Sequence, residues 1–197
     1  MALDVAALLR ETGALLTGHF RLSSGLHSPS YVQCALLLED PRNARAIGQE
    51  LGGKLRGFGA KRIVAPALGG VIIGYTVAEA LGLPSIFTER KEGRMTLRRG
   101  FSIAADERVI IVEDVVTTGK STRETADVVQ KHGGAVAGFA SILNRSGKAN
   151  PFAPALYQSL LDLDLETYDE AGCPLCNAGV PLDAPGSRFT KACPTPS

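Results

Sequence analysis

The fold is decided by one stretch of the chain, which reads Val109-Ile110-Ile111-Val112-Glu113-Asp114-Val115-Val116-Thr117-Thr118-Gly119-Lys120-Ser121-Thr122. Its four leading apolar residues are typical of a strand that is buried on both faces of a parallel sheet. Two acids, a turn rich in hydroxyl groups and the start of a helix near Gly119 follow. Ligands of open α/β sheets bind at the carboxyl ends of strands, so this stretch predicts a ligand site.

Strands and helices alternate on both sides of this stretch. Short apolar runs predict strands over 63–65, 85–88 and 135–143. The pattern lapses after Pro151, although residues 160–165 alternate Leu with Asp as in a half-buried strand. Helices are predicted from Pro41 to Leu55, with Asp40 as N-cap, and over 70–81 and 119–132. This alternation predicts an α/β fold with a five-stranded, parallel central sheet flanked by helices.

The ends of the chain follow a different pattern. A first helix should begin after Asp4, and residues 18–34 predict two short strands around a turn. Pro151 and Pro154 mark a second boundary. We therefore expect a single domain over 1–197, with a core of about 41–150 and a small hood subdomain built from 1–40 and 151–197.

Charge and hydropathy exclude several classes of protein. The formal net charge is +1, so no global field indicates a nucleic-acid or membrane-surface partner. No apolar run approaches the roughly 20 residues that a membrane span needs. The amino terminus has an early acid and lacks the basic segment of a secretory signal. We expect a cytoplasmic protein.

The turn after the central strand suits a phosphate group. The first turn of a helix offers unpaired N–H groups and the positive end of its dipole. Thr117, Thr118, Ser121 and Thr122 add hydroxyl donors, and Gly119 allows the backbone to approach a ligand closely. We therefore predict that this turn binds a phosphate.

The paired acids require a different ligand, because carboxylates repel phosphate. Glu113 and Asp114 can instead accept hydrogen bonds from sugar hydroxyls beside the phosphate. They can also offset positive charge that develops at C1 of the sugar as a leaving group departs. The predicted ligand is thus a phosphorylated ribose.

Two other interpretations of this stretch are weaker. Gly119-Lys120-Ser121 imitates the end of a P-loop, but that motif needs glycine where this chain has Asp114. A buried strand followed by an ordinary capped helix explains residues 109–112 but not two adjacent acids with four hydroxyl residues.

Residues 109–121 resemble the phosphoribosyl-diphosphate (PRPP) signature of the type I phosphoribosyltransferases. The resemblance implies the fold of that family, with Glu113 and Asp114 as catalytic acids. It also implies a set of PRPP-binding residues, namely Arg90, Lys91, Glu113, Asp114, Val115, Val116, Thr117, Thr118, Gly119, Lys120 and Ser121.

A wider resemblance covers nearly the whole chain and is to the orotate phosphoribosyltransferases. It rests on five segments, which are residues 18–28, 66–70, 90–94, 143–147 and the tail with Cys173-Pro174-Leu175-Cys176. It implies transfer of the phosphoribosyl group from PRPP to orotate, giving orotidine 5′-monophosphate and diphosphate in pyrimidine biosynthesis. Thr117 and Arg145 would contact orotate, since a guanidinium binds a carboxylate well.

The same resemblance implies a role for the basic stretch 89–100, which predicts a mobile loop or a hairpin. Arg90, Lys91 and Arg94 would neutralise the diphosphate together with Mg²⁺, and the loop would reach the neighbouring site of a homodimer. Arg94 stands where the family has a catalytic lysine. Arginine keeps the charge but donates protons poorly, so we expect electrostatic help to the leaving group. Ser23 and Gly69 also replace lysines of other family members.

Two rival functions share parts of this pattern. A purine phosphoribosyltransferase would keep residues 113–121 but would ignore orotate. A transcriptional regulator could keep the sugar-phosphate site as a sensor, but it would carry a DNA-binding segment or a basic face.

The remaining motifs indicate little. Cys173 and Cys176 form one Cys-x-x-Cys, and Cys193 could supply only a third ligand to a zinc site. We therefore expect a loosely packed thiol pair and assign no metal ligand. His19 is expected to be an ordinary surface or packing residue.

Overall fold

The structure is a computed structural model that describes residues 3–22 and 24–185 of the chain. Ser23 and Cys193, which were named above, lie outside the described residues.

A central sheet of six strands organises the described chain, in the order β5-β4-β3-β6-β7-β8. Five of these strands run parallel, as predicted, namely β3 (Arg62–Pro66), β4 (Ser85–Lys91), β6 (Arg108–Val116), β7 (Ala135–Asn144) and β8 (Tyr157–Asp162). The sixth, β5 (Arg94–Leu97), pairs antiparallel with β4 and closes a hairpin. For the basic stretch 89–100 we predicted either a mobile loop or a hairpin, and it forms a hairpin.

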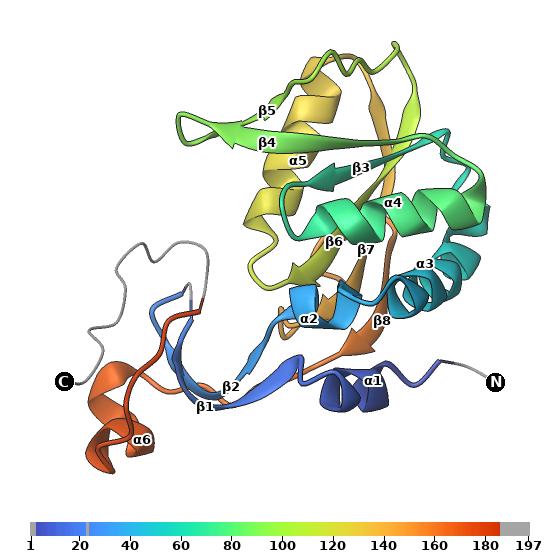
Figure 1. Ribbon diagram of the computed structural model, residues 1–197. Helices are drawn as coiled ribbons and strands as arrows, with labels where there is room; N and C mark the ends of the chain where they lie inside the picture. The colour runs from blue at the N-terminus through green and yellow to red at the C-terminus, as the bar shows by residue number, and fades with distance from the viewer. Residues whose placement is uncertain (1–2, 23, 186–197) are drawn as a thin grey trace.

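Helices cover both faces of this sheet (Figure 1). α3 (Pro41–Leu55) and α4 (Gly70–Leu81) pack on one face, and α5 (Lys120–Lys131) packs on the other. Successive side chains of β6 point alternately to the two helical layers. Ile110 and Val112 join the cluster that contains α3 and α4, whereas Val109 and Ile111 join the cluster that contains α5. The central strand is thus buried on both faces, which fixes where its carboxyl end lies.

The predicted helix signals are confirmed. Asp40 accepts a hydrogen bond from the backbone N–H of Arg42 at 2.8 Å and begins α3. Asp4 caps α1 (Val5–Glu11) by accepting from Ala7 N–H at 2.9 Å. Gly82 ends α4 with φ 67°, a left-handed conformation that favours glycine.

Two antiparallel strands form a hairpin beside the central sheet, β1 (Leu15–Arg21) and β2 (His27–Val32). The segment after β8 runs back to this hairpin and carries the short helices η2 (Glu170–Gly172) and α6 (Pro174–Asn177). Figure 1 shows α6 beside the hairpin and away from the sheet. We call the hairpin together with residues 163–185 the hood.

The hood begins later in the chain than we predicted. β8 pairs with β7 in the central sheet, although residues from 151 were assigned to the hood and a strand was expected over 160–165. The ring of Phe152 stacks on Phe139 and meets Tyr157 edge to face, so both residues pack into the core of the central sheet. The sequence also gave no sign of α2 (Cys34–Leu38) or of the one-turn helix η1 (Arg56–Phe58).

Within the described ranges, no helix is long and apolar enough to cross a membrane.

Candidate active site

Both acids of the signature lie at the carboxyl end of β6. Glu113 is 8% exposed, and its side chain lines a pocket with Val115 and Thr117. Asp114 lies against the turn between β3 and α4, where a Cβ built on Gly69 would come within 2.5 Å of its Oδ2. Gly69 has no side chain, which allows Asp114 to lie this close to the turn.

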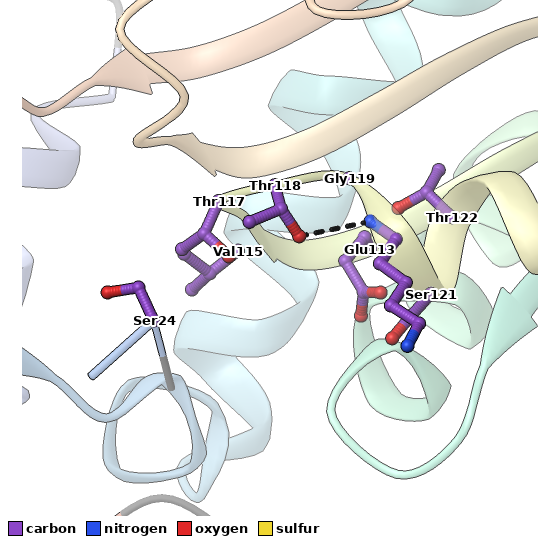
Figure 2. Close-up of a pocket in the computed structure, with 9 residues that line it drawn as sticks. Ser24, Glu113, Val115, Thr117, Thr118, Gly119, Ser121 and Thr122 are labelled. Carbon is purple, nitrogen blue, oxygen red and sulfur yellow. Dashed lines mark hydrogen bonds between the residues drawn. The ribbon is translucent and has the colours of Figure 1, made fainter. Parts of the chain in front are cut away.

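The pocket beside β6 is built almost wholly from the predicted turn. Figure 2 shows the hydroxyl side chains of the turn around it and Ser24 of the hood on the far side. Its lining residues are Ser24, Glu113, Val115, Thr117, Thr118, Gly119, Lys120, Ser121 and Thr122.

The start of α5 presents free backbone donors to this pocket. Gly119 precedes the helix with φ 70° and provides no side-chain cap. The N–H of Lys120 makes only a long contact of 3.4 Å with Thr118 Oγ1. Donors of the first turn therefore remain available to an anion, as at other helix N-termini that bind phosphate.

Arg123 fixes the shape of the turn from behind. Its guanidinium donates to the carbonyl oxygens of Thr118 at 2.6 Å and Pro151 at 2.7 Å, and it lies over the ring of Phe152. A Cβ on Gly119 would come within 2.9 Å of Arg123 Nη1 and 3.0 Å of the Phe152 ring. The turn is therefore pre-shaped by packing.

Electrostatics in this region favour the protonated forms of the acids. Burial raises the pKa of Glu113 well above its usual range, and the neighbouring charge of Asp114 raises it further. Burial also raises the pKa of Asp114, although hydrogen bonding, including that from the Val115 N–H at 2.8 Å, opposes the shift. Donors or cations brought by a ligand would stabilise the ionised pair.

A half-buried arginine lies near the acids. Arg145 follows β7, and its Nε is buried without a hydrogen-bond partner among the described residues. Burial lowers its pKa, while the nearby Tyr31 and Cys34 raise it. A buried guanidinium donor that lacks a partner is costly unless an anion binds it.

The comparisons with known proteins decide the family. Residues 37–152 match the family described as phosphoribosyl transferase domain. The chain is 50% identical over 188 residues to an orotate phosphoribosyltransferase of Carboxydothermus hydrogenoformans, with 94% of this chain and 98% of that protein covered. The chain belongs to the orotate phosphoribosyltransferase family.

Other relatives agree with this family. An orotate phosphoribosyltransferase of Thermotoga maritima is 46% identical over 187 residues, which are 95% of this chain and 100% of that protein. The crystal structure of orotate phosphoribosyltransferase from Aeropyrum pernix superposes with a TM-score of 0.66 at 26% identity, covering 81% of this chain and 93% of that one. The predicted type I phosphoribosyltransferase fold is confirmed.

The structure brings most of the predicted PRPP-binding residues of this family member together. Seven of them line the pocket, namely Glu113, Val115, Thr117, Thr118, Gly119, Lys120 and Ser121. Val116 is 1% exposed and packs in the core, so it can offer a ligand only its backbone.

The basic residues lie apart from this pocket, on the β4–β5 hairpin. Arg90 forms an ion pair with Glu124 of α5 and donates to Gly93 O at 3.0 Å. Lys91 and Arg94 are exposed and face each other across the hairpin. None of the three lines the pocket as described.

Sequence reasoning missed two polar residues that the fold places at the site. Ser24 lines the pocket beside the predicted Thr122, and Tyr31 of β2 lies close enough to Asp114 and Arg145 for their charges to shift its pKa. Ser24 belongs to the segment 18–28, one of the five segments that carry the resemblance to the family, and that resemblance was the available signal. Nothing in the local sequence marks Tyr31.

Proposed function

We propose that this chain transfers the 5-phosphoribosyl group of PRPP to orotate, giving orotidine 5′-monophosphate and diphosphate in pyrimidine biosynthesis. The observation that carries the proposal is the acid pair at the end of β6, which adjoins a phosphate-type turn, together with the buried Nε of Arg145, which has no partner among the described residues.

The 5′-phosphate would bind at the turn 115–121. Backbone donors of the first turn of α5 and the hydroxyls of Thr117, Thr118 and Ser121 surround the pocket. Each charge-assisted hydrogen bond to a phosphate oxygen is roughly twice as strong as a neutral one. Because Arg123 holds the turn in shape, little ordering is needed when the ligand binds.

Glu113 and Asp114 would accept hydrogen bonds from the ribose hydroxyls. As the bond from C1 to the diphosphate lengthens, positive charge develops on the sugar ring. Two carboxylates held nearby stabilise that charge more in the transition state than in the bound substrate, which is the condition for catalysis.

Orotate would be recognised through its carboxylate. Arg145 offers a buried Nε donor without a partner among the described residues, and Thr117 offers a hydroxyl at the same end of the sheet. A purine lacks that carboxylate and would leave the donor unpaired, which costs about 1–3 kcal/mol. This difference supports orotate over a purine base.

Arg90, Lys91 and Arg94 would close over the diphosphate and exclude water. We also propose Mg²⁺ as cofactor, because carboxylate and hydroxyl oxygens of the kind it prefers lie at this pocket. Bound to the diphosphate oxygens, it would supply charge neutralisation for the leaving group.

We further propose a homodimer in which the hairpin of one subunit serves the neighbouring site. Figure 1 shows the β4–β5 hairpin extending beyond the edge of α5. Leu68, Ile72 and Tyr75 at the start of α4 are 88%, 47% and 67% exposed. Large apolar side chains gathered at one surface are typical of an interface.

The cytoplasm is the compartment that we propose. Cys34, Cys173 and Cys176 form no disulfide among the described residues, as is usual for cysteines in reducing surroundings.

The test is an assay of base specificity. Purified protein with PRPP and Mg²⁺ should consume orotate, followed by its ultraviolet absorbance, and should leave adenine, hypoxanthine and uracil unchanged. Turnover of a purine without turnover of orotate would refute the assignment of the base. Binding of PRPP with no turnover of any base would support a sensor.

A further inference from the structure

Four metal-binding side chains meet in the hood, and none of them lines the pocket. They are His19, His27, Cys173 and Cys176, and their ligand atoms all lie within 4.8 Å of one another. Two come from the β1–β2 hairpin and two from the segment around α6. His19, His27 and Cys173 are 3%, 1% and 0% exposed, so the cluster is largely shielded from water.

The distances between these atoms, from 3.0 Å to at most 4.8 Å, are near those around a single tetrahedral ion. His19 Nε2 lies 3.0 Å from His27 Nδ1 and 3.5 Å from Cys173 Sγ, and Cys176 Sγ lies 3.2 Å from His27 Nδ1. Around zinc, with bonds of roughly 2.0–2.3 Å, neighbouring ligand atoms are about 3.3–3.8 Å apart. The four ligand atoms are also too close together for an iron–sulfur cluster, in which each ligand binds a different iron atom.

The ring of His19 is oriented as a metal ligand requires. Its Nδ1 lies 2.8 Å from the carbonyl oxygen of Val180, and a carbonyl can only accept, so Nδ1 carries the proton. In the neutral ring, Nε2 then holds a lone pair that points at the two sulfur atoms. Such a second hydrogen bond to a backbone carbonyl is the usual support of a zinc-binding histidine.

The segment that supplies the cysteines has almost no core of its own. Between residues 163 and 185, Cys173 is the only buried residue. Neither η2 nor α6 buries a residue. Backbone bonds tie the segment to the hairpin, from His27 N to Tyr168 O at 2.9 Å and from Asp183 N to His19 O at 2.8 Å. A segment with so little apolar burial commonly depends on a metal or a disulfide for its order.

We propose that His19, His27, Cys173 and Cys176 bind one structural Zn²⁺ that clamps residues 163–185 onto the β1–β2 hairpin. Two nitrogen and two sulfur ligands form a closed set with no open position, which is typical of a structural and not a catalytic zinc. The thiol pair expected from the sequence acquires its two missing ligands from residues about 150 positions earlier in the chain.

The clamp would also order the part of the hood that covers the pocket. His19 lies on β1, before the turn that carries Ser24, and His27 begins β2, directly after that turn. Zinc held by both strands and by the C-terminal segment would restrict the motion of that turn.

The first measurement is the metal content of the full-length protein, purified with its thiols reduced. We expect about one zinc per chain in the wild type and less than about a tenth of that in Cys176→Ser. Cys176 is exposed, so serine there buries no new hydroxyl. Cys34→Ala is the matched control, since Cys34 is a free thiol in the main core, and it should keep its zinc.

Replacement of zinc by Co²⁺ gives a second readout that does not depend on any variant folding. Bound Co²⁺ should show thiolate charge-transfer bands and the visible bands of a tetrahedral ion. The proposal is overturned if the wild type binds neither zinc nor Co²⁺, or if Cys176→Ser keeps full zinc and an unchanged Co²⁺ spectrum. Loss of zinc in Cys193→Ser but not in Cys176→Ser would also overturn the ligand set.

The clamp itself is tested by proteolysis after glutamate. Glu166 and Glu170 are exposed in the clamped segment. Cleavage there should be faster in Cys176→Ser, or in the wild type after chelation, than in Cys34→Ala. An unchanged rate after zinc removal would contradict the clamping role.

Discussion

At the scale of single residues, the site contains buried polar groups that lower the stability of the unliganded protein. Glu113 and Asp114 are adjacent carboxyls whose pKa values are raised by burial, and Arg145 keeps a buried donor without a partner in the described chain. Such groups cost stability and are retained where a ligand uses them. Each therefore predicts a measurable change when it is replaced.

The first prediction concerns stability against pH. The folded pKa values of the acid pair lie above their unfolded values, so folding favours the protonated forms. Their contribution to the free energy of unfolding should be greatest below about pH 4 and should fall as pH rises through the raised pKa of Glu113. Asp114→Asn removes one of the two charges and should raise the melting temperature near neutral pH.

Melting curves from pH 5 to 8.5 in the wild type and in Asp114→Asn test this sign. The test uses the difference in melting temperature between the two proteins, because carboxyls with lowered pKa values, such as Glu107, make every variant more stable as pH rises. The same variant should lose about 100-fold or more in kcat while keeping its fold. Parallel melting curves with near-native kcat and KM would contradict both roles of the pair.

The second prediction concerns Arg145. Removal of a charge-assisted bond to the carboxylate of orotate should lower kcat/KM for orotate by about 10- to 100-fold in Arg145→Ala. Arg145→Lys should recover only part of this loss, since lysine lacks the planar pair of donors. Steady-state kinetics with each substrate varied should show little change in the KM for PRPP. An unchanged KM for orotate would remove Arg145 from the base site.

At the scale of elements, the β6–turn–α5 unit is where sequence and structure agree best. Strand, acids, turn and helix start are contiguous, so local patterns were sufficient to predict them, and α5 begins at Lys120 within one residue of the expected position. The packing of Arg123 and Phe152 against this turn was not predictable in the same way. Phe152 is distant in sequence and reaches the turn only through the packing of the loop before β8.

The third prediction tests this pre-shaped turn through Gly119→Ala. Alanine is strained at φ 70° by about 1–2 kcal/mol and would press against Arg123 and Phe152. We expect the dissociation constant for PRPP to rise about tenfold or more, as measured by calorimetry. Gly53→Ala is the control, because that exposed helical position has open space around it and should only stabilise α3. Equal affinities in both variants would contradict the packing argument.

At the scale of the whole molecule, long-range assembly is what the sequence left open. Alternation predicted the parallel sheet and its helices, but not that β8 joins the sheet or that the hood begins only after residue 162. The four-residue cluster of the hood could not be recognised locally either. Its histidines and cysteines are about 150 residues apart and meet only because the C-terminal segment returns to the first hairpin.

The fourth prediction addresses the proposed dimer by mixing two inactive subunits. If the hairpin serves the neighbouring site, a hybrid of Arg94→Ala and Asp114→Asn contains one site with both intact residues. Random pairing should then restore about a quarter of wild-type activity. Each variant alone sets the baseline. No recovery in hybrids confirmed by native mass spectrometry would place the hairpin over its own site.

The central claim is that the turn 115–121 holds the 5′-phosphate of a ribose whose hydroxyls face Glu113 and Asp114. A crystal structure with ribose 5-phosphate tests it most directly. We predict phosphate density on the first-turn N–H groups of α5, with both ribose hydroxyls bonded to the acid pair. Density for the sugar phosphate anywhere else, with this turn unoccupied and the acids out of its reach, would contradict the account.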